Sequence, residues 1–371
     1  MQRYFGIAIL DHGLTRILAS TFLGGSGNDR GSVFVLDEAG HLIVAGSATT
    51  PDFPVGPEGF DRSFERKQDV FVAKFGADLA QVETPALRRA AAAADRPALQ
   101  RLLKNEPNLA AEKDRYGRIL LHTAARFALT GILDLLLQAK ADINAADESG
   151  NTPLHLAVLG KHPGTVAALL AGGADPNRQN RDGNMPLHLA AHLGNEDILN
   201  RLAAEKADLE ARNKRGNTPL HRAVFSRQKT TVQALLNRGA DIKAKNSDGL
   251  TPLHYAVIVV RNSEVVALLL KSGAPVNERN ARGETPFHLA AQYPDESNWP
   301  ELLKANPDVN ARDNDDVLAL HHAAYRGRVE LVKEMLKRGI DVSAKDNKGK
   351  TALDVATAAK RTAIIELLKN R

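Results

Sequence analysis

The stretch Gly150-Asn151-Thr152-Pro153-Leu154-His155 decides the fold of this chain of 371 residues. Glycine suits a turn with positive φ, threonine is a favoured helix N-cap, and proline fits the first helical position because its missing N–H is no loss there. The stretch therefore predicts a turn that leads directly into a short helix. The apolar pattern continues to Val158 and breaks near Gly160, and a second apolar run that ends at Gly172-Gly173 predicts a second helix.

This stretch recurs along the chain with an almost constant period. Seven histidines are separated by 33, 33, 33, 33, 34 and 33 residues: His122, His155, His188, His221, His254, His288 and His321. The turn glycine keeps the same spacing, except that Asp316 stands where one glycine is missing. Neither helix of a unit is long enough to bury its apolar face alone, so the units must stack into one continuous core.

The repeated unit resembles the ankyrin repeat. Thr-Pro-Leu-His stands intact at Thr152 to His155, Thr218 to His221 and Thr251 to His254, and the resemblance covers about Ala86 to Arg371. It implies a helical-repeat solenoid that binds a partner protein and does not catalyse a reaction. It also implies a structural role for the seven histidines, in which each imidazole holds its turn by hydrogen bonds.

Several units depart from this motif. The turns at Ile119-Leu120 and Leu318-Ala319 lack Thr-Pro, Met185 replaces threonine, and Phe287 replaces leucine. We expect these units to be less rigidly capped, because the hydroxyl that accepts a backbone N–H is absent where threonine is missing.

The first part of the chain reads as β structure. Strand-like runs at residues 32–36, 41–45 and 70–75 are separated by turn clusters. Ser20 to Gly27, Gly46 to Pro54 and Asp69 to Lys74 look like one unit of a bacterial β-propeller repeat family (SBBP-type). A single blade leaves one face exposed, since propellers close by radial repetition. Docking on the first helices, association with other copies and a remnant of a longer ancestral gene all stay open.

We therefore predict a mainly α chain with four parts. Residues 1–82 form a small antiparallel β-sheet resembling one propeller blade, 83–113 an N-terminal capping helical repeat, 114–346 seven ankyrin repeats, and 347–371 a C-terminal capping repeat. Asp354 takes the place of histidine in this last unit.

Composition excludes several classes of site. The chain has no cysteine, so disulfides, thiolate metal sites and cysteine nucleophiles are absent. No run approaches the roughly 18 apolar residues of a membrane span, and no export signal is seen, which favours the cytoplasm over an extracellular location. Residues 86–371 carry 42 basic and 33 acidic side chains, against 7 and 11 before them. The repeat array is thus the part that favours an acidic partner.

No catalytic residue, cofactor or metal is predicted. Gly24 to Gly27 is followed by a strand and not by a helix N-terminus, so it does not read as a phosphate loop. His188 and His192 have metal-ligand spacing without an adjacent acidic residue, while His321 and His322 diverge by about 100° on a helix. Nucleic-acid binding is an alternative suggested by the pI of about 9.3, as is an accessory role in a larger enzyme.

In proteins that this chain resembles, partners are held by the turn tips and by the exposed face of each first helix, which line a concave groove. The corresponding turn residues are Arg115, Tyr116, Arg118, Glu148, Arg181, Lys214, Arg215, Asp248, Arg282 and Glu284. The positions four residues after each histidine are Arg126, Leu159, His192, Phe225, Ile258, Gln292 and Tyr325, and Tyr293 next to Gln292 is included in the predicted set. Packing between units is the alternative role for Phe225 and Ile258, and solvated surface charge for the basic tips.

The unit from Gly283 to Asp313 differs from the others. Pro300, next to the only tryptophan, Trp299, aligns with the interior of the second helix elsewhere. Proline inside a helix costs about 3 kcal/mol or more. The second helix of this unit is therefore predicted to be short or to start late.

Overall fold

The computed structural model describes residues 87, 90–91, 95–259, 263–293 and 297–370 in full, together with the backbone of five strands between residues 5 and 75. The chain divides into two compact units. One comprises Met1–Asp114 with Thr130–Ala141, and the other comprises Arg115–Leu129 with Asp142–Arg371. The second unit, called the repeat array below, contains nearly all of the described repeats.

The strands of the first unit pair in two antiparallel groups. They are β1 (Phe5–Leu10) with β2 (Ile17–Leu23), and β3 (Arg30–Leu36), β4 (Leu42–Ala48) and β5 (Asp69–Phe75) in the order β3-β4-β5. The sequence predicted one sheet, whereas these strands form a two-stranded and a three-stranded sheet. The segments 24–27 and 49–54, which carry part of the propeller-type resemblance, lie outside the described residues, so the propeller blade stays a prediction.

The first unit includes the helix α2 (Arg96–Asn105), the 3-10 helix η2 (Pro107–Ala111) and the helix α4 (Thr130–Gln138), and α2 contacts both of the others. Asp95 caps α2, because its carboxylate accepts the backbone N–H of Ala98 at 2.9 Å.

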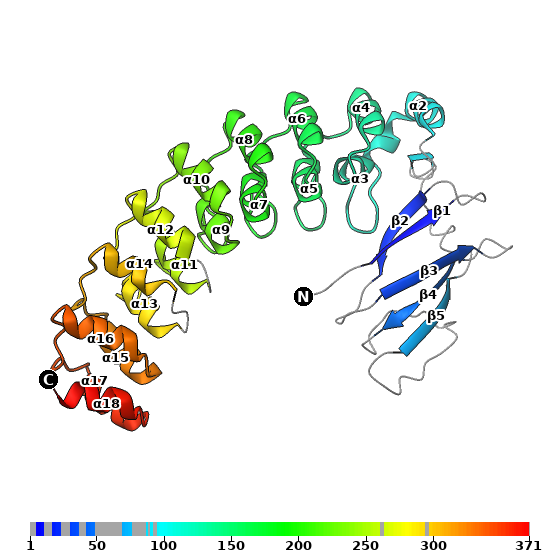
Figure 1. Cartoon of the computed structure of the whole chain (residues 1–371). Coiled ribbons are helices and arrows are strands. Elements are labelled where there is room, and N and C mark those ends of the chain that lie inside the picture. The colour runs from blue at the N-terminus through cyan, green and yellow to red at the C-terminus, as the bar shows by residue number, and fades with distance from the viewer. Residues whose placement is uncertain are drawn as a thin grey trace. The chain divides into compact units, whose positions relative to one another are not determined.

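The repeat array consists of two rows of short helices. The first-helix row contains α3 (Leu120–Arg126), α5 (Pro153–Gly160), α7 (Pro186–Leu193), α9 (Pro219–Phe225), α11 (Pro252–Ile258), α13 (Pro286–Gln292), α15 (Ala319–Arg326) and α17 (Ala352–Ala358). The second-helix row contains α6 (Pro163–Ala171), α8 (Glu196–Ala204), α10 (Lys229–Asn237), α12 (Ser263–Lys271), α14 (Trp299–Lys304), α16 (Val329–Lys337) and α18 (Thr362–Lys369). Each first helix contacts the next one in its row, as Figure 1 shows from α5 to α15. The predicted stack of two-helix units is confirmed.

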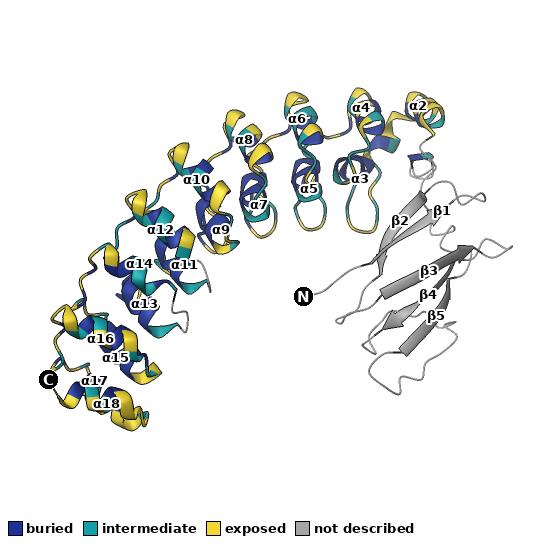
Figure 2. Cartoon of the chain, viewed as in Figure 1, coloured by how far each residue is buried: buried dark blue, intermediate teal, exposed yellow. Residues whose placement is uncertain are grey.

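The core lies between the two rows and between successive units. In the unit of α5 and α6, Leu154, Ala157, Val158, Val166 and Leu169 are fully buried. Figure 2 shows a similar pattern from α5 to α12, with buried residues where helices face one another and exposed residues at the outer ends of the second helices. Because each helix offers only a few apolar residues, its burial depends on the neighbouring units.

The helix starts follow the predicted capping chemistry. Thr152, Thr218 and Thr251 each accept a backbone N–H from the histidine three residues later, and proline begins the helix. Ile119 and Leu318 make no such side-chain bond, which confirms that these units lack the hydroxyl cap.

The turn before each helix requires a left-handed residue. Gly150 has φ of +75°, and a Cβ added there would lie 2.7 Å from the backbone nitrogen of Arg181 in the next unit. Asp316 adopts φ of +59°, as the sequence predicted for the residue in the glycine position. The turn is therefore fixed both by backbone conformation and by the close approach of the next turn.

Helix α14 is the shortest of the second helices, with 6 residues against 9 in α12 and α16. It begins at Trp299, which places Pro300 in the first turn, where a missing N–H costs little. The predicted late start is confirmed. Buried Asn298, just before the helix, donates its side-chain amide to the Val257 carbonyl oxygen at 3.1 Å.

Two glycines of one unit should respond oppositely to alanine. Gly150→Ala places a Cβ at positive φ against backbone atoms, so the free energy of unfolding should fall by about 1–3 kcal/mol. Gly164, in α6, has nothing within 4 Å of an added Cβ, so Gly164→Ala should raise this free energy by about 0.5–1 kcal/mol. Urea unfolding of both variants measures the difference. Equal changes of one sign would contradict the turn geometry.

Candidate functional site

Each histidine of the repeat motif joins two successive units. The backbone N–H of Thr152 donates to Nδ1 of His155 at 3.1 Å, and Nε2 of His155 lies 3.0 Å from the carbonyl oxygen of Asn184 in the next turn. The Nε2 contact recurs at 2.9–3.1 Å for the other six: His122, His188, His221, His254, His288 and His321. In two of the three units without threonine, the N–H groups of Met185 and Leu318 still reach the imidazole, whereas Nδ1 of His122 has no hydrogen-bond partner.

These contacts define one tautomer of the imidazole. Because Nδ1 accepts a backbone N–H, the proton of the neutral ring sits on Nε2 and is donated to the carbonyl of the next unit. Burial lowers the pKa of His155, His188, His221 and His254 to about 4, although hydrogen bonds to backbone carbonyls raise it. Protonation would place a second N–H against the N–H of the cap residue. Both nitrogens of His188 are occupied in this way, so it has no free lone pair for a metal shared with His192.

The turn tips are connected to one another by backbone hydrogen bonds. The N–H of Arg181 donates to the Ser149 carbonyl oxygen at 2.8 Å, and the N–H of Lys214 donates to that of Asp182 at 3.0 Å. Within a turn, the side-chain oxygen of Asn213 accepts the N–H groups of Arg215 and Asn217. The tips therefore form a continuous ladder that holds their side chains at fixed spacing.

An aromatic cluster with one arginine lies on α9 and α11. Phe225 is 49% exposed, and its ring meets Tyr255 edge to face at 6.2 Å between centroids. The guanidinium carbon of Arg222 lies 5.9 Å from the centroid of the Phe225 ring. Ile258, one turn after Tyr255 on α11, is half-buried. Phe225 thus both packs and faces solvent.

Two more exposed aromatic rings lie close to arginine side chains. Tyr116, 47% exposed, has Arg115 and Arg118 each 4.8 Å from its ring centroid. Tyr325, 55% exposed, has Arg326 at 5.8 Å. These distances suit cation–π attraction, which restricts the rotamers of both partners.

The other predicted helix positions are less open. Leu159, His192, Gln292 and Tyr293 are half-buried, and so is Arg126, whose pKa is lowered by burial. The predicted tips Arg181, Lys214, Arg215 and Arg282 are exposed, as are Glu148 and Asp248.

The prediction of Glu284 as an exposed turn residue was wrong. Its relative exposure is 4%, and its carboxylate accepts the side-chain amide of Asn280 at 2.8 Å. The same carboxylate lies 3.1 Å from Nε of Arg282. The residue follows the turn glycine and points back into the stack, where asparagine stands in three other turns.

The sequence reasoning missed three residues of this face. Phe127, at the end of α3, is 43% exposed and lies five residues after His122, one position beyond the predicted series. Arg222 and Tyr255 follow their motif histidines directly. The sequence did contain a signal for these two residues, because an arginine and then an aromatic residue occupy the same position in two consecutive repeats.

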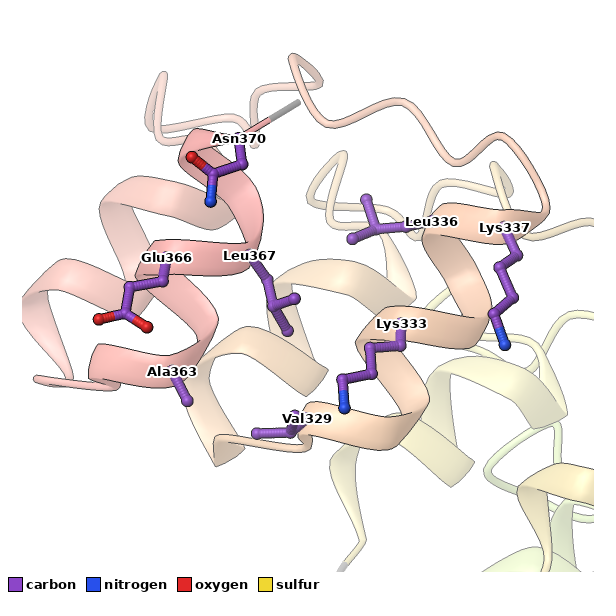
Figure 3. A pocket seen from close by; sticks show the side chains of 8 residues that line it. All are labelled: Val329, Lys333, Leu336, Lys337, Ala363, Glu366, Leu367 and Asn370. Carbon is purple, nitrogen blue, oxygen red and sulfur yellow. The ribbon is translucent and has the colours of Figure 1, made fainter.

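A separate cavity of about 540 Å³ lies between α16 and α18. In Figure 3 the side chains of Val329, Leu336 and Leu367 point into this space, with Lys333 and Lys337 on the α16 side. It belongs to the second-helix row, so it is distinct from the turn tips and the aromatic cluster. Among the fully described residues, no helix is long and apolar enough to cross a membrane.

A family model described as ankyrin repeats (three copies) matches residues 87–180, 161–246, 238–313 and 287–371. These matches cover well over half of the chain, which therefore belongs to the ankyrin repeat family. Ankyrin repeats are generally protein–protein interaction modules, and the family is typically non-enzymatic. A comparison with curated proteins gave no match.

The buried imidazoles should make the fold sensitive to acid. The four pKa values of about 4 lie below the ordinary 6.5, so the unfolded chain binds more protons between these two pH values. Stability should be complete above pH 6.5 and should fall as the pH drops toward 4. Each unit of pKa difference corresponds to about 1.4 kcal/mol, so each of the four imidazoles contributes about 3 kcal/mol to the loss.

Urea unfolding midpoints between pH 7.5 and 4.5 measure this loss. In His155→Gln, the slope against pH should decrease because one titrating group is gone. A midpoint that is the same at pH 7 and pH 5 would show that the imidazoles are not held neutral.

Proposed function

We propose that the face formed by the first helices and turn tips of the repeat array binds a segment of a partner protein. This face is the concave groove expected from the sequence. The observation that carries the proposal is Phe225, a large apolar side chain that is half exposed while Arg222 and Tyr255 hold its ring in place. Arginine and aromatic side chains dominate the energetic centres of protein interfaces.

The packing of this cluster favours binding for an energetic reason. An aromatic ring that is already fixed loses little conformational entropy when a partner covers it. About half of the Phe225 side chain is left in water, so covering it adds hydrophobic stabilisation of about 25 cal/mol per Å² of apolar surface. Phe225 is therefore the proposed anchor, and half-buried Ile258 extends the apolar contact.

The turn tips supply the charge of this face. Arg181, Lys214 and Arg215 are exposed on consecutive tips that the backbone ladder holds together. Arg282 is partly neutralised by the buried Glu284 carboxylate at 3.1 Å. On these tips and the next one, the exposed bases at 181, 214 and 215 outnumber the exposed acids Asp182 and Asp248, and we propose that the bound segment is acidic.

Affinity capture with the full chain tests the face. Phe225→Ala/Arg215→Ala should lose a protein that the wild-type chain retains, because it removes the anchor and one basic tip. Arg238→Ala, an exposed charge beside α10 on the other row, is the matched control and should retain it. Equal recovery by all three chains would discredit this face.

Ionic strength tests the charge of the captured partner. Exposed charges are screened beyond about 8 Å at physiological salt, so the association rate should fall as salt rises from about 0.02 to 0.15 M. The fall should be smaller for Arg215→Ala. Surface plasmon resonance at the two concentrations measures both rates, and a rate unaffected by salt would exclude an acidic segment.

A further inference from the structure

Glu284 and His322 are the only carboxylate and the only histidine at their positions in the repeat series. Glu284 follows the turn glycine, where asparagine stands at 151, 184 and 217. His322 follows the motif histidine, where leucine stands at 156, 189 and 289. These exceptions come from successive units, and the structure places them together with Asp313.

The exceptions replace a hydrogen bond that joins units elsewhere. The side-chain amide of Asn213 donates to the side-chain oxygen of Asn184 at 2.9 Å, and Asn246 does the same to Asn217 at 3.0 Å. The corresponding pair here is Asp313 and Glu284, which are two carboxylates. Ionised carboxylates cannot donate to each other, and their charges repel.

The local geometry leaves ligand atoms available. Oδ1 of Asp313 accepts the N–H groups of Asp315 and Val317 at 2.9 Å, which fixes the carboxylate and leaves Oδ2. Oε2 of Glu284 takes the contacts with Asn280 and Arg282, which leaves Oε1. One ligand atom from each of Glu284, Asp313 and His322 lies within 4.8 Å of the other two.

His322 supplies the third donor. Its Nε2 is buried and has no hydrogen-bond partner, an arrangement that costs free energy unless something occupies the lone pair. Burial, followed by the neighbouring His288, lowers the pKa of His322, although Glu284 and Asp313 raise it. The imidazole therefore offers a nitrogen donor beside the carboxylate oxygens of Glu284 and Asp313.

We propose that Glu284, Asp313 and His322 bind a first-row divalent transition-metal ion, with Zn²⁺ as the best fit. One imidazole and two carboxylates form a donor set suited to Zn²⁺, whereas Mg²⁺ and Ca²⁺ prefer oxygen ligands alone. Zn–N and Zn–O bonds of about 2.0–2.2 Å require the three atoms to draw slightly closer. The ion would replace the missing amide bond between these units.

Such a site would stabilise the array where its second helix is shortest. The ligands come from the turns before α13 and α15 and from α15 itself, so the folded stack assembles them and the unfolded chain does not. Binding to the folded state alone shifts the unfolding equilibrium by mass action.

Metal-stripped full chain, titrated with Zn²⁺ by calorimetry and melted with and without Zn²⁺, tests the site. The wild type should bind one ion in this site and melt at a higher temperature. His322→Leu and Glu284→Asn, each the residue found at that position in other units, should weaken binding by at least about tenfold and abolish the shift. Melting in EDTA should show that both variants remain folded.

His192→Leu, which removes a half-buried histidine of another unit, is the matched control and should bind and melt like the wild type. Zn²⁺ binding that persists in His322→Leu and Glu284→Asn would overturn the proposal, as would loss of binding in His192→Leu alone. An equal rise of the melting temperature with Mg²⁺ would overturn the assigned donor set.

Discussion

The array depends on one hydrogen-bond relay, in which a neutral imidazole accepts from the start of its own helix and donates to the next turn. The first bond is buried and the second is partly buried, so each unit is tied to its successor by groups that water replaces only at a cost. The backbone ladder at the turn tips adds a second tie outside the core. Apolar burial alone would let neighbouring helices slide, whereas these directional bonds fix their register.

The repeated hydrogen bonds belong to the frame of the array, and the proposed recognition surface is made of side chains outside that frame. Histidines, caps and left-handed turns repeat because every junction requires the same geometry. The exposed side chains at the tips and first-helix ends are under no such constraint, and they vary from Tyr116 to Phe225 and Tyr325. Ankyrin repeats generally bind other proteins, and here rigidity below the surface holds a non-repeating set of side chains in fixed positions.

Much of the frame could be predicted from sequence, because turn conformation, capping and proline placement are local. The left-handed Asp316 and the late start of α14 followed from single residues. The buried position of Glu284 could not be foreseen, since it depends on which carboxylates and amides meet across a junction. Likewise, the Arg222–Phe225–Tyr255 cluster spans two units, and no pattern within one unit specifies it.

The relay also gives the repeat array a polarity. Every motif histidine donates toward the C-terminus, from His122 to Asn151 and onward to His321 and Lys350. In the last unit, Asp354 binds only its own cap residue, Thr351, so the chain of forward bonds stops there. When the C-terminal unit unfolds first, its acceptor carbonyl leaves and the histidine of the preceding unit loses its partner. When the N-terminal unit unfolds first, its histidine leaves and the carbonyl of the following unit loses its donor. The two ends of the stack are therefore mechanically different, although their helices look alike.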